Sequence, residues 1–484
     1  MMVKQERRLR FAPSPTGPIH VGNAHTMLFN WLWCRSQGAT FVLRFEDTDR
    51  ERSRREWEEV IISEMQWLGL DWDEGPDIGG HFAPYYQTAR MNLYQEYFET
   101  LKQRDAVYPC YCTSEELAEE RKEADRQKIA YKYSRRCLAL TTEERAAKER
   151  AGRRPAWRLL VPDNEIVAYA DLIRGRIEFA TNQIGDPVIM RASGVPLYHF
   201  AVVVDDITMG ITDVVRGEGH ISNTAVQLLI YRQLGVLPPR FAHCSHLLNT
   251  ERGKISKRKG EMSVRSFREQ GILGETLFNY LALLGWTPKN EAREFLTKEA
   301  IIREFTLSEV SRSAAIFDEK KLRWMNGIYL RAKSREALAE LALPFIVEAG
   351  LATEEALRGR WTWFMEITAL VRERVALLDE IPPYLDFFFK EEVDYNEKAV
   401  HKFLSPTIRP FLHQTTETMK TVEWSIPSIE QGVRTLIDEM SLKAREALLA
   451  LRVAISGREV SPPLFESIYF LGREQVIFRL TRWI

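Results

Sequence analysis

The N-terminal part of the chain has short apolar runs on either side of a segment with helical periodicity. Residues 9–11 form a run that stops at Pro13 and predicts a buried strand. After a turn rich in proline and glycine, apolar residues recur at helical spacing to about residues 37–38, which predicts a helix. Residues 40–45 predict a second strand. A strand, turn, helix and strand in this order form a βαβ unit, in which ligands lie at the carboxyl ends of the parallel strands.

The pattern changes twice further along the chain. Residues 91–198 combine clustered cysteines, a basic stretch and short strand-like runs, and we interpret them as an insertion. Residues 198–206 form a continuous apolar run that ends in two acids, which predicts another central strand of the first sheet. From about Glu275 the apolar period is helical almost to the end, and the last ~150 residues are enough for a helical domain of their own.

Composition narrows the class of protein. A chain of 484 residues exceeds one ordinary hydrophobic core, and contents of 45% apolar and 28% charged residues are typical of a soluble globular protein. No run of about eighteen apolar residues predicts a membrane span, and the N-terminus has no apolar signal region, so we expect a cytoplasmic protein without membrane contact. Five cysteines in so long a chain argue against a disulfide framework. With a net charge of −1, binding to nucleic acid would require a local basic face.

The turn before the first predicted helix offers a site for phosphate. The free N–H groups and the dipole of a helix favour a triphosphate at its N-terminus. Gly22 removes a side chain where phosphate must approach closely, and His20 can donate a hydrogen bond to charge that develops on it. A lone His-x-Gly is more often an ordinary surface turn, but the strand before it and the helix after it favour a nucleotide site.

A second candidate is a basic loop in the middle of the chain. Lys254, Lys257 and Arg258 place three cations within five residues, with a glycine on each side of the group. A basic run is usually a solvated surface, but a mobile cationic loop can also hold leaving pyrophosphate in a transition state. Ser256 is small enough to let the backbone approach phosphate.

These two motifs, in this order and at this separation, resemble the HIGH and KMSKS motifs of class I aminoacyl-tRNA synthetases. The surrounding segments resemble bacterial glutamyl-tRNA synthetases more narrowly; they are residues 10–17, 44–49, 201–206, 209–218 and 240–243. Residues 451–462 resemble the C-terminal domain of that family. The resemblance covers nearly the whole chain.

Some positions differ from the family pattern. Ile255 replaces the usual Leu or Met of the loop, His25 stands where Arg is common, and Lys259 stands where His often follows the loop. Gly219 replaces the usual Asp after Gly-Glu and could alter the packing beneath Arg216. None of these changes removes a charge that we assign to catalysis.

The resemblance implies a multidomain fold of α/β plus all-α type, in which a Rossmann-type parallel sheet with an inserted α/β domain is followed by a helical stem-contact and anticodon-binding region. The Rossmann catalytic domain is expected in two parts, residues 1–90 and 199–245. Residues 91–198 would form the inserted acceptor-binding domain. Residues 246–335 would form the stem-contact domain with the KMSKS-like loop, and residues 336–484 the helical anticodon-binding region.

The resemblance also implies a reaction. L-Glutamate would be joined to the 3′ end of tRNA-Glu through a glutamyl-adenylate, which consumes ATP and releases AMP and pyrophosphate. Mg²⁺ is expected as the counter-ion of ATP, and activation in this family typically requires bound tRNA. We expect the enzyme to be a monomer. Positioning and charge stabilisation should supply most of the rate, without a covalent enzyme intermediate.

The same resemblance assigns candidate site residues. Catalytic roles are expected for His20, Gly22, Lys254, Lys257 and Arg258. ATP contacts are expected from Thr16, Gly17, His20, Gly22, Asn23, Ser256 and Lys257. The glutamate pocket would be lined by Arg10, Ala12, Ser14, Glu46, Tyr198 and Arg216. Because arginine can hold a carboxylate through two parallel hydrogen bonds, Arg10 and Arg216 suit a substrate with two carboxylates, and Glu46 suits its ammonium group.

Three cysteines form a candidate metal site within the insertion. Cys110 and Cys112 are separated by one residue, and Cys137 follows after 24 more. Thiolates at such spacing can hold Zn²⁺, which prefers four tetrahedral ligands. The pattern resembles the zinc site of some glutamyl-tRNA synthetases, which ends in Cys-x-His, but this chain has Ala139 at the histidine position. Tyr133 could be the fourth ligand, as a tyrosine is in a related truncated enzyme; three reduced cysteines without metal are the alternative.

Other functions stay open at this point. The same enzyme could charge tRNA-Gln as well as tRNA-Glu, and the residues that read the anticodon would decide this. A regulatory RNA-binding paralogue without ligase activity is disfavoured because the residues of both motifs are intact. A truncated enzyme that glutamylates a modified tRNA base lacks an anticodon domain, and the long helical C-terminal region argues against it.

Overall fold

The computed structural model describes residues 6–49, 51–253, 255, 262–289 and 293–484. The chain forms two compact units. The first consists of Met1–Phe267 and Leu277–Asp318, and the second of Arg268–Thr276 and Glu319–Ile484. The first unit contains all the strands of the described residues, and the described part of the second is helical.

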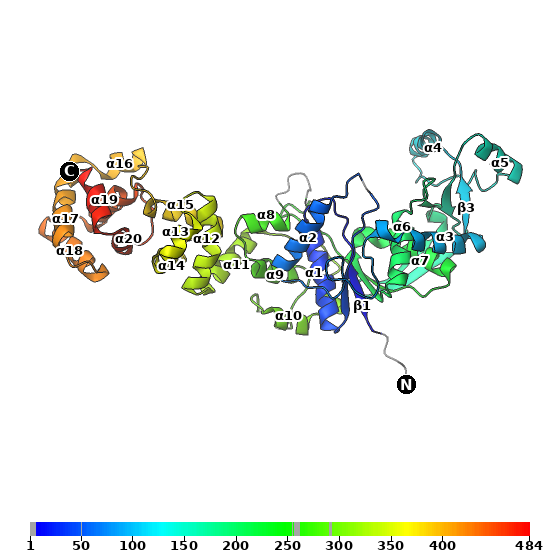
Figure 1. Ribbon diagram of the computed structural model, residues 1–484, viewed down its shortest axis with the longest axis horizontal. Coiled ribbons are helices and arrows are strands. Elements are labelled where there is room, and N and C mark those ends of the chain that lie inside the picture. Colours follow the sequence, from blue (N-terminus) through cyan, green and yellow to red (C-terminus); the bar gives the residue numbers. More distant parts are fainter. Residues whose placement is uncertain (1–5, 50, 254, 256–261, 290–292) are drawn as a thin grey trace. The chain divides into compact units, whose positions relative to one another are not determined.

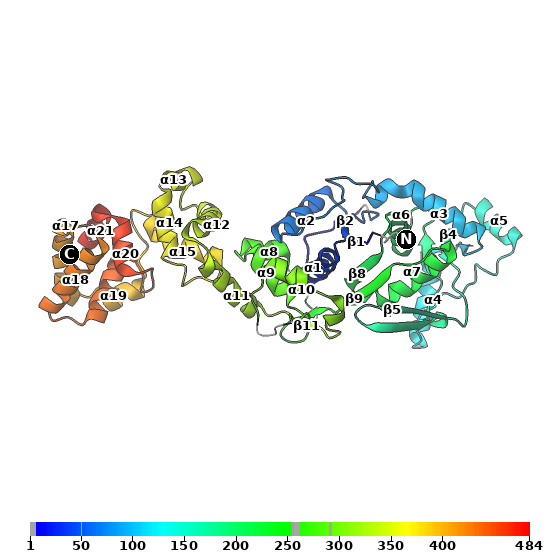
Figure 2. The same cartoon turned by 90° about the horizontal axis from the view of Figure 1, so that it is seen from below.

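A six-stranded sheet forms the centre of the first unit, with the strand order β2-β1-β8-β9-β5-β6 (Figures 1 and 2). Its strands are β1 (Arg8–Phe11), β2 (Thr40–Leu43), β5 (Ile166–Asp171), β6 (Gly175–Ala180), β8 (Asp213–Gly217) and β9 (Arg240–Cys244). Neighbouring strands are parallel except β5 and β6, which are antiparallel at one edge. Leu9 pairs with Phe41 on one side and with Asp213 on the other. The carboxyl ends of β1, β2, β8 and β9 therefore lie along the same edge of the sheet.

Helix α1 (Val21–Ser36) connects β1 to β2 and packs on both strands and on β8. It begins directly after the turn rich in proline and glycine, where His20 occupies the N-cap with an extended backbone, φ −70° and ψ 146°. Leu28, Trp31 and Leu32 face the core and are at most 1% exposed. The predicted βαβ unit is confirmed.

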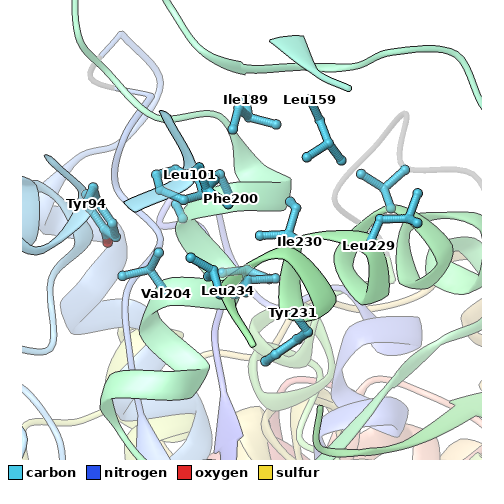
Figure 3. Close-up of a cluster of buried hydrophobic side chains, with 14 of the residues drawn as sticks. Tyr94, Leu101, Leu159, Ile189, Phe200, Val204, Leu229, Ile230, Tyr231 and Leu234 are labelled. Atoms are coloured by element: carbon cyan, nitrogen blue, oxygen red, sulfur yellow. The ribbon is translucent and has the colours of Figure 1, made fainter. Parts of the chain in front are cut away.

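One predicted strand is wrong. Residues 198–206 belong to helix α6 (Tyr198–Thr208). The first strand after this helix along the chain is β8, which belongs to the central sheet. The run has no helical periodicity in sequence because α6 packs between α3 (Met91–Gln103) and α7 (Ile221–Leu234). Figure 3 shows Phe200 and Val204 of α6 among side chains of both neighbouring helices, Tyr94, Leu101, Ile230 and Leu234. A helix that is buried on several sides resembles a buried strand in its sequence.

Residues 91–198 contribute to two sheets. A separate antiparallel sheet has the order β3-β4-β7. Its strands are β3 (Val107–Cys110), β4 (Ala156–Leu159) and β7 (Val188–Met190), and the connection between the first two contains α4 (Ser114–Arg126) and α5 (Thr142–Arg150). In contrast, β5 and β6 extend the central sheet, where Asp171 pairs with Phe241 of β9. The boundaries of the insertion stay a prediction, but two of its strands complete the central sheet.

The remaining elements of the first unit come after α7 in the chain, and one of them, a short helix, packs on α1. The short strands β10 (Leu247–Leu248) and β11 (Ala315–Ile316) pair in parallel, and α10 (Lys298–Glu304) packs on α1. Helices α8 (Val264–Glu269) and α9 (Gly274–Ala282) have residues in both units. Short 3₁₀ segments occur at Gln87–Arg90, Thr181–Gln183, Glu218–His220, Leu307–Glu309, Leu378–Glu380, Asp386–Phe388 and Pro406–Ile408.

The second unit is helical, as the sequence predicts. Its helices are α11 (Glu319–Ala332), α12 (Arg335–Glu348), α13 (Glu354–Gly359), α14 (Trp361–Ala369), α15 (Ile381–Leu385), α16 (Glu397–Phe403), α17 (Arg409–Thr421), α18 (Ile426–Glu439), α19 (Ala444–Ser456), α20 (Leu464–Leu471) and α21 (Arg473–Thr481). They enclose two apolar cores, one around Ile346 and Phe364 and the other around Phe411 and Leu451. Figure 2 shows α17 to α21 gathered around the second of these cores. Among the described residues, no helix has the length and apolar character needed to cross a membrane.

Candidate active site

A cavity of about 1300 Å³ lies at the carboxyl ends of β1 and β8 and at the N-terminus of α1. The predicted nucleotide and glutamate residues that the structure describes all line it: Thr16, Gly17, His20, Gly22, Asn23, Arg10, Ala12, Ser14, Glu46, Tyr198 and Arg216. Residues from separate segments of the chain are thus brought to one place. Ile255 also lines the cavity. The predicted loop residues Lys254, Ser256, Lys257 and Arg258 lie outside the described residues.

His20 is held in one orientation at the start of α1. Its Nδ1 accepts a hydrogen bond from the backbone N–H of Gly22 at 3.2 Å, so the proton of the neutral ring is on Nε2. A Cβ atom at Gly22 would meet only His20 Nδ1, at 3.6 Å, and one at Gly17 would meet nothing within 4 Å. The described packing therefore does not require glycine at either position. This open space suits a bound group that approaches the backbone closely.

The segment that follows the basic loop is attached to the first motif. His20 pairs with Ser263 in an isolated antiparallel bridge. Glu64, on α2 (Arg55–Trp67), is 3% exposed and joins the two segments. One of its carboxylate oxygens accepts the N–H of Ile19 at 2.7 Å, and the other accepts the N–H of Arg265 at 3.1 Å. The residues that come after the loop are therefore fixed next to His20.

Two buried arginines share one buried carboxylate beside the cavity. Arg10 donates from Nε and Nη2 to Asp206 at 3.1 and 3.3 Å, and Arg44 donates from Nη1 to the same carboxylate at 2.9 Å. Burial alone would raise the pKa of Asp206, but the charges of Arg10 and Arg44 lower it, so Asp206 is ionised. Nη1 of Arg10 makes no hydrogen bond to any residue that the structure describes. Because Arg10 lines the cavity, this nitrogen can donate to an anion there.

Glu46 contributes a carboxylate to the cavity wall. It pairs with Nη2 of Arg44 at 3.4 Å, a long contact for an ion pair. Burial raises the pKa of Glu46 to about 7, although the charges of Arg44 and Arg10 act in the opposite direction. A buried carboxylate with so weak a pairing is stabilised by a cation that enters the cavity. The position therefore suits an ammonium group.

Arg216 is a buried cation with neutral partners. Its Nε donates to Nε2 of His243 at 3.2 Å, and its Nη2 donates to Thr224 at 2.6 Å and to Gln227 at 2.8 Å. Its Nη1 is 3.4 Å from the hydroxyl of Tyr198. No carboxylate of the described residues forms an ion pair with it, and burial lowers the pKa of Arg216. Holding this charge without an anion costs free energy, which an anionic ligand would offset.

The cavity also contains residues that were not predicted from the sequence. His220, Asn223 and His246 line it, and Nδ1 of His220 is 3.0 Å from the hydroxyl of Tyr198. Burial lowers the pKa of His220 to about 4, so its ring is neutral near pH 7. The rule that ligands lie at the carboxyl ends of parallel strands could have located these residues, because His220 follows β8 and His246 follows β9.

The three cysteines of the insertion converge on one point. Their sulfur atoms all lie within 4.8 Å of one another, and Cys112 is 3.4 Å from Cys137. The hydroxyl of Tyr133 is 3.2 Å from the sulfur of Cys112 and 3.5 Å from that of Cys110. Three sulfur donors and one oxygen donor suit Zn²⁺ better than Mg²⁺ or Ca²⁺, which prefer oxygen.

Known proteins match the chain along its whole length. Residues 6–324 match the family of tRNA synthetases class I (E and Q), catalytic domain, and residues 337–484 match an anticodon binding domain. A glutamate–tRNA ligase of Symbiobacterium thermophilum is 56% identical over 475 residues, 98% of this chain and 98% of that protein. The chain belongs to the glutamate–tRNA ligases. Another ligase of this name, from Moorella thermoacetica, is 42% identical over 482 residues, 99% of this chain and 98% of the relative.

A solved structure of the same ligase family has the same fold. The glutamate–tRNA ligase of Elizabethkingia meningosepticum, solved in complex with its amino acid, has a TM-score of 0.87 at 31% identity and covers 99% of both chains. The predicted family, the Rossmann-type α/β fold and the helical anticodon-binding region are confirmed. Class I synthetases in general use ATP and Mg²⁺, the two cofactors expected from the sequence of this ligase.

Proposed function

We propose that this ligase forms glutamyl-adenylate in the cavity and transfers the glutamyl group to the 3′ end of tRNA-Glu. The glutamate carboxylate would attack the α-phosphate of ATP and release pyrophosphate. The terminal ribose hydroxyl of the tRNA would then attack the activated carbonyl and release AMP. The named ligase relatives support this proposal, as does the cavity that both predicted residue sets line together.

One observation carries the choice of amino acid: Arg216 is buried beside the cavity and has no anionic partner among the described residues. We assign it to the side-chain carboxylate of glutamate, and Arg10 to the carboxylate that reacts. Glu46 would hold the ammonium group, and Tyr198 would bound the side chain. Glutamine offers no charge to Arg216, so the site disfavours it. Ala12 and Ser14 line the same cavity and complete the proposed pocket.

ATP is proposed to bind at the N-terminus of α1. Gly22 would let the triphosphate approach the backbone, and His20 would donate from Nε2 to charge that develops on phosphate. Further contacts are assigned to Thr16, Gly17 and Asn23, which line the same cavity. Lys254, Ser256, Lys257 and Arg258 stay predictions for the pyrophosphate side, and Mg²⁺ for the counter-ion of ATP.

One charging assay tests both the reaction and the choice of tRNA. The purified enzyme is incubated with ATP, Mg²⁺, labelled glutamate and either tRNA-Glu or tRNA-Gln. We expect labelled product with tRNA-Glu. Product with neither tRNA would refute ligase activity and favour the regulatory paralogue, and product with both would identify relaxed tRNA choice. Labelled glutamine in place of glutamate is the control for amino acid choice.

We further propose that Cys110, Cys112 and Cys137 hold one Zn²⁺, with Tyr133 as the fourth ligand. A bound zinc ion would join β3 to the segment that contains Cys137 and so stabilise the insertion. The convergence of three sulfurs and one hydroxyl supports this assignment. Nε of Arg136 donates to the sulfur of Cys112 at 3.1 Å and would offset part of the negative charge of three thiolates.

The finer expectations on assembly and location are also proposals. We propose that the ligase acts as a monomer in the cytoplasm. Light scattering during size-exclusion chromatography tests the first point, because a monomer gives the mass of a single chain whatever its shape.

A further inference from the structure

Two buried polar residues behind Arg216 have no role in the proposed reaction. They are Asp171, at the end of β5, and His243, on β9, and they form a row of hydrogen-bonded side chains that ends at Arg216 on β8. Oδ2 of Asp171 is 2.6 Å from Nδ1 of His243, and Nε2 of His243 is 3.2 Å from Nε of Arg216. The side chains of Asp171 and His243 are 0% exposed. The three residues come from three adjacent strands of the central sheet.

The hydrogen bonds determine which nitrogen of His243 carries a proton. Nε of Arg216 is always a donor, so Nε2 of His243 must accept and Nδ1 must carry the proton of the neutral ring. That proton is donated to Asp171, whose other oxygen accepts the backbone N–H groups of Ile173 and Arg174, both at 2.9 Å. Asp171 therefore fixes both the orientation and the tautomer of His243.

The charges around His243 agree with a neutral ring. Burial lowers the pKa of His243, the hydrogen bond to Asp171 and the charge of that carboxylate raise it, and the charges of Arg216 and Arg174 lower it; the pKa is lowered overall. Burial would raise the pKa of Asp171, but the hydrogen bonds from His243 and from two backbone N–H groups lower it. Among the described residues, the hydroxyl of Thr224, at 3.1 Å, and the ring of Tyr169 also face His243. Arg216 is thus oriented by a neutral group.

We propose that His243 and Asp171 are positioning residues that aim Arg216 at the side-chain carboxylate of glutamate. The inference rests on the glutamate-binding role proposed for Arg216. A carboxylate in direct contact would also orient the guanidinium, but it would compensate its charge, as Asp206 does for Arg10. The interposed imidazole fixes the guanidinium plane through Nε, and Nη1, whose partner among the described residues is the Tyr198 hydroxyl at 3.4 Å, keeps a second N–H for the substrate. The positive charge is kept for glutamate.

Three substitutions separate this role from simple packing. His243→Asn keeps a donor near Asp171 but loses the acceptor for Nε of Arg216, whereas His243→Gln extends an acceptor to the position of Nε2. Asp171→Asn presents an N–H to Nδ1, which moves the imidazole proton to Nε2, opposite the N–H of Arg216. We expect the KM for glutamate in charging of tRNA-Glu to rise about tenfold or more in His243→Asn and Asp171→Asn, and less than about threefold in His243→Gln. The KM for ATP should stay unchanged.

Asp186→Asn is the matched control. Asp186 is also a buried carboxylate of the first unit, but it accepts from Tyr108 and Arg135 and does not line the cavity. Its substitution should lower thermal stability without changing the KM for glutamate. The double variant of Asp171→Asn with His243→Asn should use glutamate no worse than His243→Asn alone, because the tautomer no longer matters.

The proposal would be overturned by an equal impairment of His243→Gln and His243→Asn, and also by equal rises of the KM for glutamate and for ATP in these variants. Arg216→Gln distinguishes this failure from a failure of the function assigned to Arg216. An unchanged KM for glutamate in Arg216→Gln would remove the role of Arg216 itself. A raised KM there, with normal values in His243→Asn and Asp171→Asn, would refute only the positioning role.

Discussion

Arg216→Gln should impair the use of glutamate far more than the use of ATP. Arg216 is 6% exposed and its guanidinium donates to neutral groups, so the glutamate carboxylate would be its anionic partner. A glutamine at this position carries no charge and cannot offer two parallel donors. The bound carboxylate would then be desolvated without a counter-ion, a penalty of about 2–5 kcal/mol. At about 1.4 kcal/mol per factor of ten, kcat/KM for glutamate should fall roughly 30-fold or more.

Steady-state charging of tRNA-Glu measures this effect, first with glutamate varied at saturating ATP and then with ATP varied. The melting temperature should change little, because the loss of the hydrogen bonds of Arg216 is offset by the removal of an uncompensated buried cation. Arg135→Gln is the matched control: this guanidinium pairs with Asp163 and Asp186, so its loss should lower stability and leave both Michaelis constants unchanged. If both Michaelis constants rise equally in Arg216→Gln, the residue is structural and the reasoning is refuted.

Lys257→Ala should slow tRNA-dependent pyrophosphate exchange by the equivalent of roughly 2–4 kcal/mol without unfolding the protein, because one transition-state contact to phosphate is lost. An exchange rate equal to that of the wild type would contradict this role. The kcat/KM for glutamate should fall as the pH drops below about 7, because protonated Glu46 cannot hold the substrate ammonium group. Glu46→Gln should have a low kcat/KM for glutamate that does not depend on pH in this range. Elemental analysis of protein purified without chelator should find close to one zinc per chain and less in Cys137→Ser; below about a tenth of a zinc per unmodified chain would exclude the site.

The local parts of the fold could be predicted from the sequence, and the exception is informative. The unit of β1, α1 and β2 has its turn, its period and its ends within one continuous segment. Helix α6 could not be recognised, because it packs against helices on more than one side and its buried run has no polar face to reveal a period of 3.6 residues. Periodicity identifies elements at the border between core and solvent, and it fails for elements inside the core.

In the candidate site, too, local features could be predicted from the sequence and long-range contacts could not. The residues around His20 form one continuous turn, and the family resemblance added Glu46, Tyr198 and Arg216, which the structure brings to the same cavity. Residues 240–243 share the family resemblance, but nothing in the sequence linked His243 to Asp171, because the two are 72 residues apart and each occupies an ordinary strand position. Only the strand order, which sets β5 beside β9, brings them together.

The position of β5 and β6 matters for anyone who recombines this ligase with its relatives. A cassette exchange of residues 91–198 would carry both strands, and with them Asp171, into the hybrid. Such a hybrid would receive a foreign edge of the central sheet and a foreign support for Arg216 in the same step. A change in amino acid use would then be mistaken for a change in RNA contacts. Crossover points that leave residues 166–180 with the host sheet would avoid this confusion.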